Sequence, residues 1–356
     1  MNPAAMKPAD LTAAFLTEAL APHLDGARVT DVDLAVVGAG QMGECLRLTL
    51  DYDKAGAGPT TLVAKLASAD ENSRAAAALV RAYEIEVNFY RLLAGGLTVR
   101  TPRCFHAGYD AGSGDFVLLL EDIADGRQGD QIAGCSPDQA AAAVAQLPGL
   151  HAPHWGDESL DRLDWLHRNT PENSGNLSAV IAMLYPGFVE RYADRLPADV
   201  MSLSEQVVGS LDTFNADRPR PWTVSHSDFR LDNLLFTGTS ASDPVVVVDW
   251  QTCVYGPGIS DLAYFLGGSL TVEDRRTHER DLVRDYHQRM VAAGVPLTWD
   301  ELWLQYRRYT VAGLIMAVAA SMLVKRTPRG DDMFMAMAER AGRHALDLDY
   351  ASARSM

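Results

Sequence analysis

The chain has 356 residues, of which 47% are hydrophobic and 22% charged, and its formal net charge at pH 7 is −16. This is an ordinary globular composition in a chain long enough for two subdomains with cores of their own. The negative charge disfavours a nucleic-acid or anionic-membrane partner, although a local basic cluster and Mg²⁺ can still hold an anionic nucleotide.

The cysteines and the N-terminus predict a cytoplasmic protein. Four cysteines are scattered without a CxxC pair, which is typical of reduced thiols: Cys45, Cys104, Cys135 and Cys253. The first ten residues lack the apolar run of a signal peptide. The longest apolar stretch, residues 311–324, is too short to span a bilayer and predicts a buried helix. We therefore expect no membrane partner, and no feature indicates an oligomeric state.

Residues 1–122 predict a small lobe rich in β-strands. A helix capped by Asp10 is expected to run to Leu20. It is followed, in chain order, by strand 29–37, strand 44–52, strand 61–66, helix 73–94, strand 103–109 and strand 116–120. The first two strands alternate apolar and polar residues, and the long helix repeats its apolar residues at helical spacing.

Residues 123–356 are expected to form a larger, mainly helical lobe. Its first helix is opened by Ser136 and Pro137, with the proline at the first helical position. Short strands interrupt the helices at residues 234–236 and 245–248. The sequence carries no internal repeat, so it predicts two lobes with a boundary near Ile123.

The turn at residues 38–43 holds Gly38, Gly40 and Gly43 in GxGxxG spacing, which has two functional interpretations. In a Rossmann dinucleotide site the third glycine opens a helix, which would indicate an NAD(P)-dependent oxidoreductase. Residues 44–52 alternate with a period of two, which favours a strand and a glycine-rich hairpin over nucleotide phosphates. A plain hairpin without a ligand is the third possibility. A helix at residues 44–52 would support the Rossmann site, and a strand there would exclude it.

Lys65 lies in an apolar strand, where an ammonium group is costly unless it has a partner. The following helix offers Glu84 and Glu86, which lie on different faces. Glu86 is next to the apolar face of Ile85 and Phe89, so we expect it to orient Lys65 toward nucleotide phosphates. The alternative is a solvated lysine and two solvated glutamates.

The most informative pattern is His226-x-Asp228-x-x-x-x-Asn233, followed by an apolar run that ends in Asp249-Trp250-Gln251. A carboxylate near an attacking hydroxyl, then an amide oxygen and a second carboxylate, suits chemistry on a Mg²⁺-bound phosphate. This pattern predicts phosphoryl transfer.

Taken together, these segments and the stretch Leu118-Leu-Leu-Glu-Asp122 resemble the protein-kinase-like small-molecule phosphotransferases. That group includes aminoglycoside phosphotransferases and choline kinases, and the sequence is most similar to the ecdysteroid-kinase-like family. The resemblance implies an α+β, bilobal protein-kinase-like fold with an antiparallel N-lobe sheet (1–122) and a helical C-lobe (123–356). It also implies an ATP- and Mg²⁺-dependent kinase that phosphorylates a hydroxyl of a small molecule. No activation loop or Ala-Pro-Glu segment is evident, which argues against a protein substrate.

The resemblance implies roles for single residues. Asp228 would be the catalytic base, and Asn233 and Asp249 would ligate Mg²⁺. Arg230 would meet the γ-phosphate, or would instead pair with Asp232 or Asp261.

The remaining implied roles are supporting ones. His226 would hold the catalytic loop by hydrogen bonds. Asp261 would brace this loop, unless Ser260 and Asp261 simply cap the next helix. The main chain near Glu121 and Ile123 would bind the adenine.

Two departures from the kinase pattern limit the resemblance. Ser227 replaces a residue that is often Gly or Arg in related kinases, and Asp249-Trp-Gln replaces the Asp-Phe-Gly of protein kinases, so a flip of that segment is not implied. A nucleotide-binding pseudokinase is the further alternative, which the intact Lys65, Asp228, Asn233 and Asp249 disfavour.

The acceptor has several candidates. Aromatic and methionine residues of the helical lobe predict either a pocket for a hydrophobic, steroid-like alcohol, a cage for choline, or ordinary core packing. They are Trp155, Trp165, Tyr185, Tyr192, Trp222, Tyr255, Tyr264, Met316, Met322, Met333, Met335 and Met337. The net charge also permits a cationic aminoglycoside acceptor.

Overall fold

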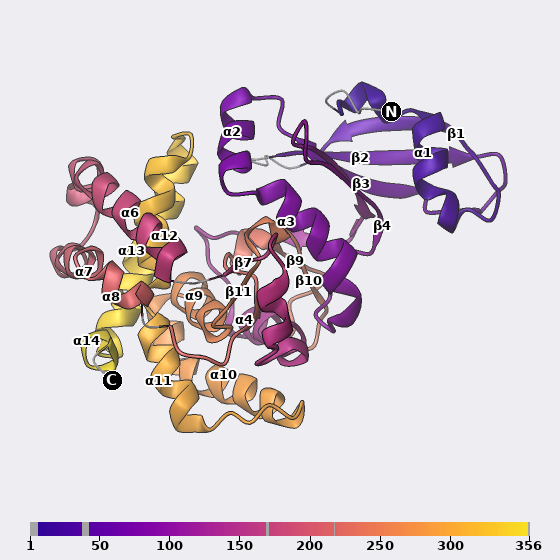
Figure 1. Cartoon of the computed structure of the whole chain (residues 1–356). Coiled ribbons are helices and arrows are strands. Elements are labelled where there is room, and N and C mark those ends of the chain that lie inside the picture. The colour runs from indigo at the N-terminus through magenta and orange to yellow at the C-terminus, as the bar shows by residue number, and fades with distance from the viewer. Residues whose placement is uncertain (1–5, 38–42, 169–170, 217, 355–356) are drawn as a thin grey trace. The chain divides into compact units, whose positions relative to one another are not determined.

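The computed structural model describes residues 6–37, 43–168, 171–216 and 218–354, and it divides into two compact units (Figure 1). The first unit comprises Met1–Gly96, Thr101–Asp125 and Asp249–Thr252. The second comprises Leu97–Arg100, Gly126–Val248 and Cys253–Met356. The first unit therefore includes a short segment, Asp249–Thr252, from far along the chain.

The first unit is built on a five-stranded antiparallel sheet in the order β1-β2-β3-β5-β4. The strands are β1 Val29–Val36, β2 Gly43–Tyr52, β3 Thr61–Ala67, β4 Cys104–Asp110 and β5 Asp115–Glu121. The helices are α1 Ala13–Leu20, α2 Glu71–Leu79 and α3 Ala82–Asn88, with short helical turns at η1 Pro8–Asp10, η2 Ala21–His23, η3 Phe89–Leu93, η4 Ala94–Gly96 and η9 Trp250–Thr252.

The two faces of this sheet differ in chemistry because side chains alternate along each strand. One face is apolar and forms the core under α1 (Figure 1). Its members include Leu16, Leu20, Leu46, Leu48, Leu62, Ala64, Leu66 and Leu119. On the opposite face Cys45 of β2 pairs with Lys65 of β3, and Arg47 pairs with Val63. The alternation therefore places the basic side chains of β2 and β3 on the side that the apolar core leaves open.

Two expectations for the helices of this unit are wrong. The helix expected at residues 73–94 is broken at Arg81, whose φ of 54° is left-handed. No Gly or Pro precedes the break, so the sequence gives no local signal for it. As a result Leu79 is 86% exposed, whereas Ile85 and Phe89 are fully buried. The first helix begins at Ala13 and is capped by Thr12, not by Asp10.

The second unit is mainly helical, and its strands form two small three-stranded sheets. Its helices are α4 Pro137–Val144, α5 Leu147–His151, α6 Pro171–Tyr192, α7 Ala198–Val208, α8 Leu211–Ala216, α9 Ile259–Ser269, α10 Val272–Ala292, α11 Trp299–Tyr309, α12 Ala312–Leu323, α13 Pro328–Asp347 and α14 Tyr350–Arg354, with short turns at η5 Ala152–His154, η6 Glu158–Arg162, η7 Ala193–Arg195 and η8 Leu231–Asn233. The strands are β6 Arg127–Gln128, β9 Leu234–Phe236 and β10 Val245–Val247 in one sheet, and β7 His167–Arg168, β8 Thr223–Ser225 and β11 Val254–Gly256 in the other.

Helix α9 lies at the centre of this unit. It packs against α11, α12 and α13, and its residues are buried on almost every side. Such a helix is a rigid support for any side chain that projects from it. The antiparallel sheet of the first unit and the helical second unit confirm the expected α+β architecture. No helix in the described ranges has the length and apolar character needed to cross a membrane.

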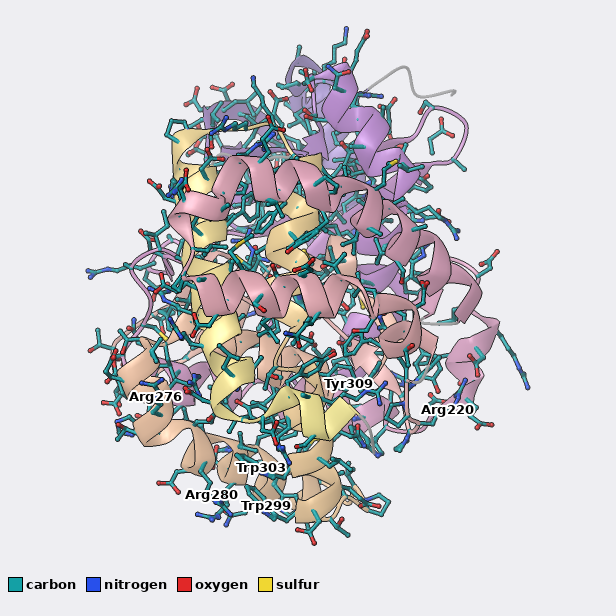
Figure 2. All side chains as sticks on the ribbon, turned by 90° about the vertical axis from the view of Figure 1, so that its left-hand side faces the viewer. Arg220, Arg276, Arg280, Trp299, Trp303 and Tyr309 are labelled. Atoms are coloured by element: carbon teal, nitrogen blue, oxygen red, sulfur yellow. The ribbon has the colours of Figure 1, made fainter. Side chains whose placement is uncertain are left out.

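A ladder of stacked side chains links α10 to α11 (Figure 2). Trp299 and Trp303 stack with ring centroids 5.4 Å apart. The guanidinium of Arg280 lies 5.3 Å from the ring centre of Trp303 and 5.7 Å from that of Trp299. Such cation–π contacts let the arginine cover apolar ring surface while keeping its charge near water.

A buried ionic cluster joins α10, α11 and α13. Glu279 accepts hydrogen bonds from Arg275 (3.0 Å) and from the Tyr306 hydroxyl (2.7 Å), and His344 Nε2 lies 2.5 Å from its Oε1. Burial lowers the pKa of His344 in spite of the nearby carboxylate. A second proton would lie on Nδ1, which finds no hydrogen-bond partner in the described part of the chain.

We expect stability to fall as the pH is lowered below about 6.5, the ordinary pKa of histidine. Between that value and the lower pKa of folded His344, the unfolded chain binds one more proton, so acid favours unfolding. Burial also lowers the pKa of His106, which therefore makes stability fall with decreasing pH in the same way. Urea unfolding between about pH 7.5 and 5.5 measures the slope of the unfolding free energy against pH. One titrating group contributes up to ~1.4 kcal/mol per pH unit to this slope. His344→Gln should flatten it, and an unchanged slope would contradict this origin.

Candidate active site

In the first unit, Lys65 lies between two carboxylates. Its Nζ is 2.8 Å from Glu86 Oε1 and 2.6 Å from Asp249 Oδ1. Burial works to lower the pKa of Lys65, but the charges of Asp249 and Glu86 outweigh it and hold that pKa well above its usual range. The lysine is therefore charged. Glu84, the other sequence candidate, pairs with Arg81.

The segment that begins at Asp249 is fixed against α3 and η3. The Trp250 main-chain N–H donates to Glu86 Oε1 at 3.3 Å, and the Trp250 ring stacks on Phe89 with centroids 3.9 Å apart and planes inclined by 6°. Asp249 itself has a φ of 67°, an uncommon value for a residue other than glycine. Sequence reasoning missed this stack, although the Trp of Asp-Trp-Gln and the buried Phe89 were both visible.

The sequence predicts two nucleotide-binding segments in this unit, the glycine turn at residues 38–43 and the main chain near Glu121 and Ile123. Gly38 and Gly40 lie outside the described residues. Gly43 begins β2, where a Cβ would lie only 3.0 Å from the Leu66 carbonyl oxygen. Because residues 43–52 form a strand and not a helix, the Rossmann interpretation of GxGxxG is wrong.

The segment after β5 is held by an ion pair that the sequence did not reveal. Arg47 donates two hydrogen bonds to the buried carboxylate of Asp122, at 2.8 and 3.0 Å. Glu121 is tied to Arg103 through its main-chain N–H and its side chain. Within the described ranges, no hydrogen bond reaches the main chain of Ile123.

In the second unit, Asp228 receives three side-chain donors. Its Oδ1 accepts from the Tyr264 hydroxyl at 2.8 Å, and its Oδ2 accepts from Arg230 Nε at 3.1 Å and Asn233 Nδ2 at 2.9 Å. Asn233 Nδ2 also donates to the Asp228 carbonyl oxygen at 2.9 Å. Both bonds use the amide nitrogen, so neither of them occupies the amide oxygen of Asn233.

Asp261 holds the chain just before Asp228. Its Oδ2 accepts from the His226 main-chain N–H at 2.7 Å, and its Oδ1 from that of Ser227 at 2.9 Å. Burial works to raise the pKa of Asp261, but its hydrogen bond and charge interaction with His151 help to hold it below the ordinary value. The side chain thus braces another segment and does not cap its own helix. Ser227 has a φ of 63°, which glycine would adopt without strain.

His226 and Arg230 complete the loop. His226 Nε2 lies 3.0 Å from the Val248 carbonyl oxygen, and its Nδ1 accepts from the Asp228 main-chain N–H at 3.3 Å, so the imidazole is used in holding the loop. Arg230 pairs with Asp232 at 2.6 Å and with Asp228, and no ion pair with Asp261 is found in the described chain.

Comparison with known proteins assigns the family. The model of the ecdysteroid kinase-like family matches residues 37–295. The chain belongs to this family. No curated protein matches the sequence significantly.

Two solved structures resemble this ecdysteroid kinase-like protein in fold. A choline kinase from Cryptosporidium parvum Iowa II has a TM-score of 0.55 at 11% identity, over 90% of this chain and 89% of that one. A GDP complex of an aminoglycoside 2'-phosphotransferase has a TM-score of 0.52 at 12% identity, over 96% of this chain and 100% of that one. The family and this fold identify the protein as a small-molecule kinase.

Each unit of this ecdysteroid kinase-like protein carries one side-chain oxygen of the kind that Mg²⁺ prefers. No group of three or more His, Cys, Asp or Glu that could hold a metal is present among the described residues. Mg²⁺ differs from metals that need such cages, because it binds one or two protein oxygens together with water and phosphates. The amide oxygen of Asn233 and the carboxylate of Asp249 are oxygens of this kind.

Most of the aromatic and methionine residues considered for an acceptor pocket are core residues. Those that are buried are Trp165, Tyr192, Trp222, Tyr255, Tyr264, Met333, Met335 and Met337. Tyr264 differs from the others because its hydroxyl contacts Asp228. Core packing, one of the three sequence interpretations, therefore accounts for most of this set.

Proposed function

We propose that the protein transfers the γ-phosphate of ATP, with Mg²⁺, to a hydroxyl of a small, hydrophobic, steroid-like alcohol. The observation that carries the proposal is the arrangement around Asp228. An ionised carboxylate has about four acceptor sites. Arg230 and Asn233 occupy the two hydrogen-bond acceptor sites of Oδ2, and Tyr264 occupies one of the two on Oδ1. Among these side chains, one site on Oδ1 is left, which can accept a hydrogen bond from the substrate hydroxyl.

In this mechanism Asp228 accepts the proton of the acceptor hydroxyl. The oxygen of that hydroxyl forms a bond to the γ-phosphorus, and the bond between this phosphorus and the departing ADP oxygen breaks. The reaction has a loose transition state, so positioning and charge neutralisation supply most of the rate. Arg230 is charged and next to Asp228, where it can meet the transferred phosphoryl group.

Nucleotide binding is assigned to the remaining candidate residues. Lys65, oriented by Glu86, binds the α- and β-phosphates, and the glycine turn at residues 38–43 is the second proposed phosphate-binding segment. The main chain near Glu121 and Ile123 binds the adenine. Asn233 and Asp249 are the proposed ligands of Mg²⁺, which when bound neutralises phosphate charge.

The charges around Asp228 favour a neutral acceptor over a cationic one. Asp232 is paired with Arg230, and Arg329 lies 3.7 Å from Asp232 and 3.6 Å from Asp130. Each of these carboxylates therefore has a cation beside it. An aminoglycoside needs acidic groups that its own ammonium groups can neutralise, and this set does not offer them.

Two measurements on the wild-type protein test the proposal. ATP·Mg²⁺ at about 100 times its Kd should raise the unfolding free energy by ~2.7 kcal/mol, and NAD⁺ should not. ADP release should then be stimulated by a polyhydroxylated steroid more than by choline, ethanolamine or kanamycin. Stimulation by a cationic acceptor alone would exclude the steroid-like substrate, and stabilisation by NAD⁺ without ATP would exclude the kinase. We also expect a cytoplasmic location, where the four free cysteines stay reduced.

A further inference from the structure

One face of helix α9 contacts the catalytic segment at two successive points. Asp261 and Tyr264 are three residues apart and so lie on the same side of the helix. Asp261 accepts from the main-chain N–H groups of His226 and Ser227. Tyr264 donates to the carboxylate of Asp228. The same rigid helix therefore fixes first the backbone and then the functional group of this segment.

Packing alone does not require a hydroxyl group on the side chain at position 264. Tyr264 is 6% exposed and its neighbour Phe265 is fully buried, so a phenylalanine would fill this kind of environment. A buried hydroxyl is costly unless it is hydrogen-bonded. Burial and the charge of Asp228 hold the pKa of Tyr264 well above its usual range, so the phenol remains a donor.

The geometry of Asp228 makes this donor consequential. The carboxylate rotates freely unless both oxygens are held, because its terminal torsion has a broad, two-fold profile. Arg230 and Asn233 both bind Oδ2, and Tyr264 alone among the side chains of the described residues binds Oδ1. Without the Tyr264 hydroxyl, Arg230 can turn to bind both oxygens in the fork geometry that arginine prefers. Such a fork would cover the acceptor site on Oδ1.

We propose that Tyr264 is a positioning residue for phosphoryl transfer: its hydroxyl holds Oδ1 of Asp228 so that the remaining acceptor site on this oxygen faces the substrate hydroxyl. The inference rests on the proposed function, in which Asp228 is the base. It assigns to α9 a part in the chemistry beyond supporting the loop through Asp261.

The test compares Tyr264→Phe with the matched control Tyr306→Phe. Tyr306 is buried as well, and its hydroxyl also donates to a carboxylate, that of Glu279, at 2.7 Å. Both variants lose one buried hydroxyl and should be destabilised to a similar extent. The probes are ADP release with water as the acceptor, ADP release with a polyhydroxylated steroid, and the Kd of ATP·Mg²⁺.

We expect Tyr264→Phe to lower kcat by about 10- to 100-fold while the Kd of ATP·Mg²⁺ stays within about two-fold, because only positioning is lost. Tyr306→Phe should retain the wild-type kcat. A wild-type kcat for Tyr264→Phe, or an equal loss in both variants, would overturn the inference. Asp228→Asn distinguishes the two levels: if it too retains wild-type turnover, the proposed function fails. If it loses turnover and Tyr264→Phe does not, only the inference fails.

Discussion

Replacing Asp228 with asparagine is expected to lower kcat by about 10²- to 10⁴-fold, the usual contribution of a positioned general base. Asparagine has the same shape, and its oxygen can still accept from Arg230 and Asn233. Its amide nitrogen would face Tyr264, whose hydroxyl can turn from donor to acceptor. The fold and nucleotide binding should therefore survive while the proton acceptor is lost. Steady-state ADP release, with the Kd of ATP·Mg²⁺ measured separately, checks this.

The matched control is Asp243→Asn. This aspartate accepts from the Ser240 main-chain N–H in a surface turn and has no part in the proposed site. It should keep the wild-type kcat. If Asp228→Asn also keeps at least about a third of the wild-type rate, Asp228 is not a base, since such a group contributes at least about 10²-fold.

The periodic segments of the fold were predictable from the sequence. The alternation in residues 44–52 correctly predicted a strand, and that strand excluded the dinucleotide site. The break at Arg81 was not predictable, because a run of alanines favours continued helix and neither Gly nor Pro marks the left-handed residue. The two-residue strands β6 and β7 were also missed, since they are too short to have a period.

The candidate site was predictable only in part. The position of Glu86 next to the apolar face of its helix indicated that it, and not Glu84, would be the partner of Lys65. The structure confirms that Glu86 contacts Lys65. The functional roles of these residues stay predictions. Three contacts had no signal in the sequence: the Arg47–Asp122 pair, the Trp250–Phe89 stack and the bond from Tyr264 to Asp228. Each joins residues distant in the chain or is one of many possible pairs of common residues, so only the folded geometry identifies them.

Replacing Lys65 with methionine is expected to weaken ATP·Mg²⁺ binding by at least about 10-fold and to lower stability by about 3 kcal/mol, the usual cost of removing one member of a buried ion pair. Methionine fills a similar volume without charge. It leaves Glu86, which is 1% exposed, beside Asp249 with no cation between them. Urea unfolding and nucleotide titration measure the two losses.

The stability lost in Lys65→Met should depend on pH with a defined sign. Burial already raises the pKa of Glu86 in the wild type, in spite of the lysine, and removing the lysine raises it further. A carboxyl whose pKa is raised on folding contributes stability below its unfolded pKa and loses it as the pH rises through the folded value. The stability deficit of the variant should therefore be larger near about pH 8 than near pH 5.

Lys54→Met is the control for both effects. Lys54 lies in the same unit, and its ammonium contacts only the Asp25 carbonyl oxygen, at 3.4 Å, among the described residues. This variant should match the wild type in nucleotide affinity and in stability at both pH values. A deficit in Lys65→Met that does not change with pH would mean that Glu86 stays ionised without the lysine. Nucleotide affinity equal to that of Lys54→Met would remove Lys65 from the phosphate-binding site.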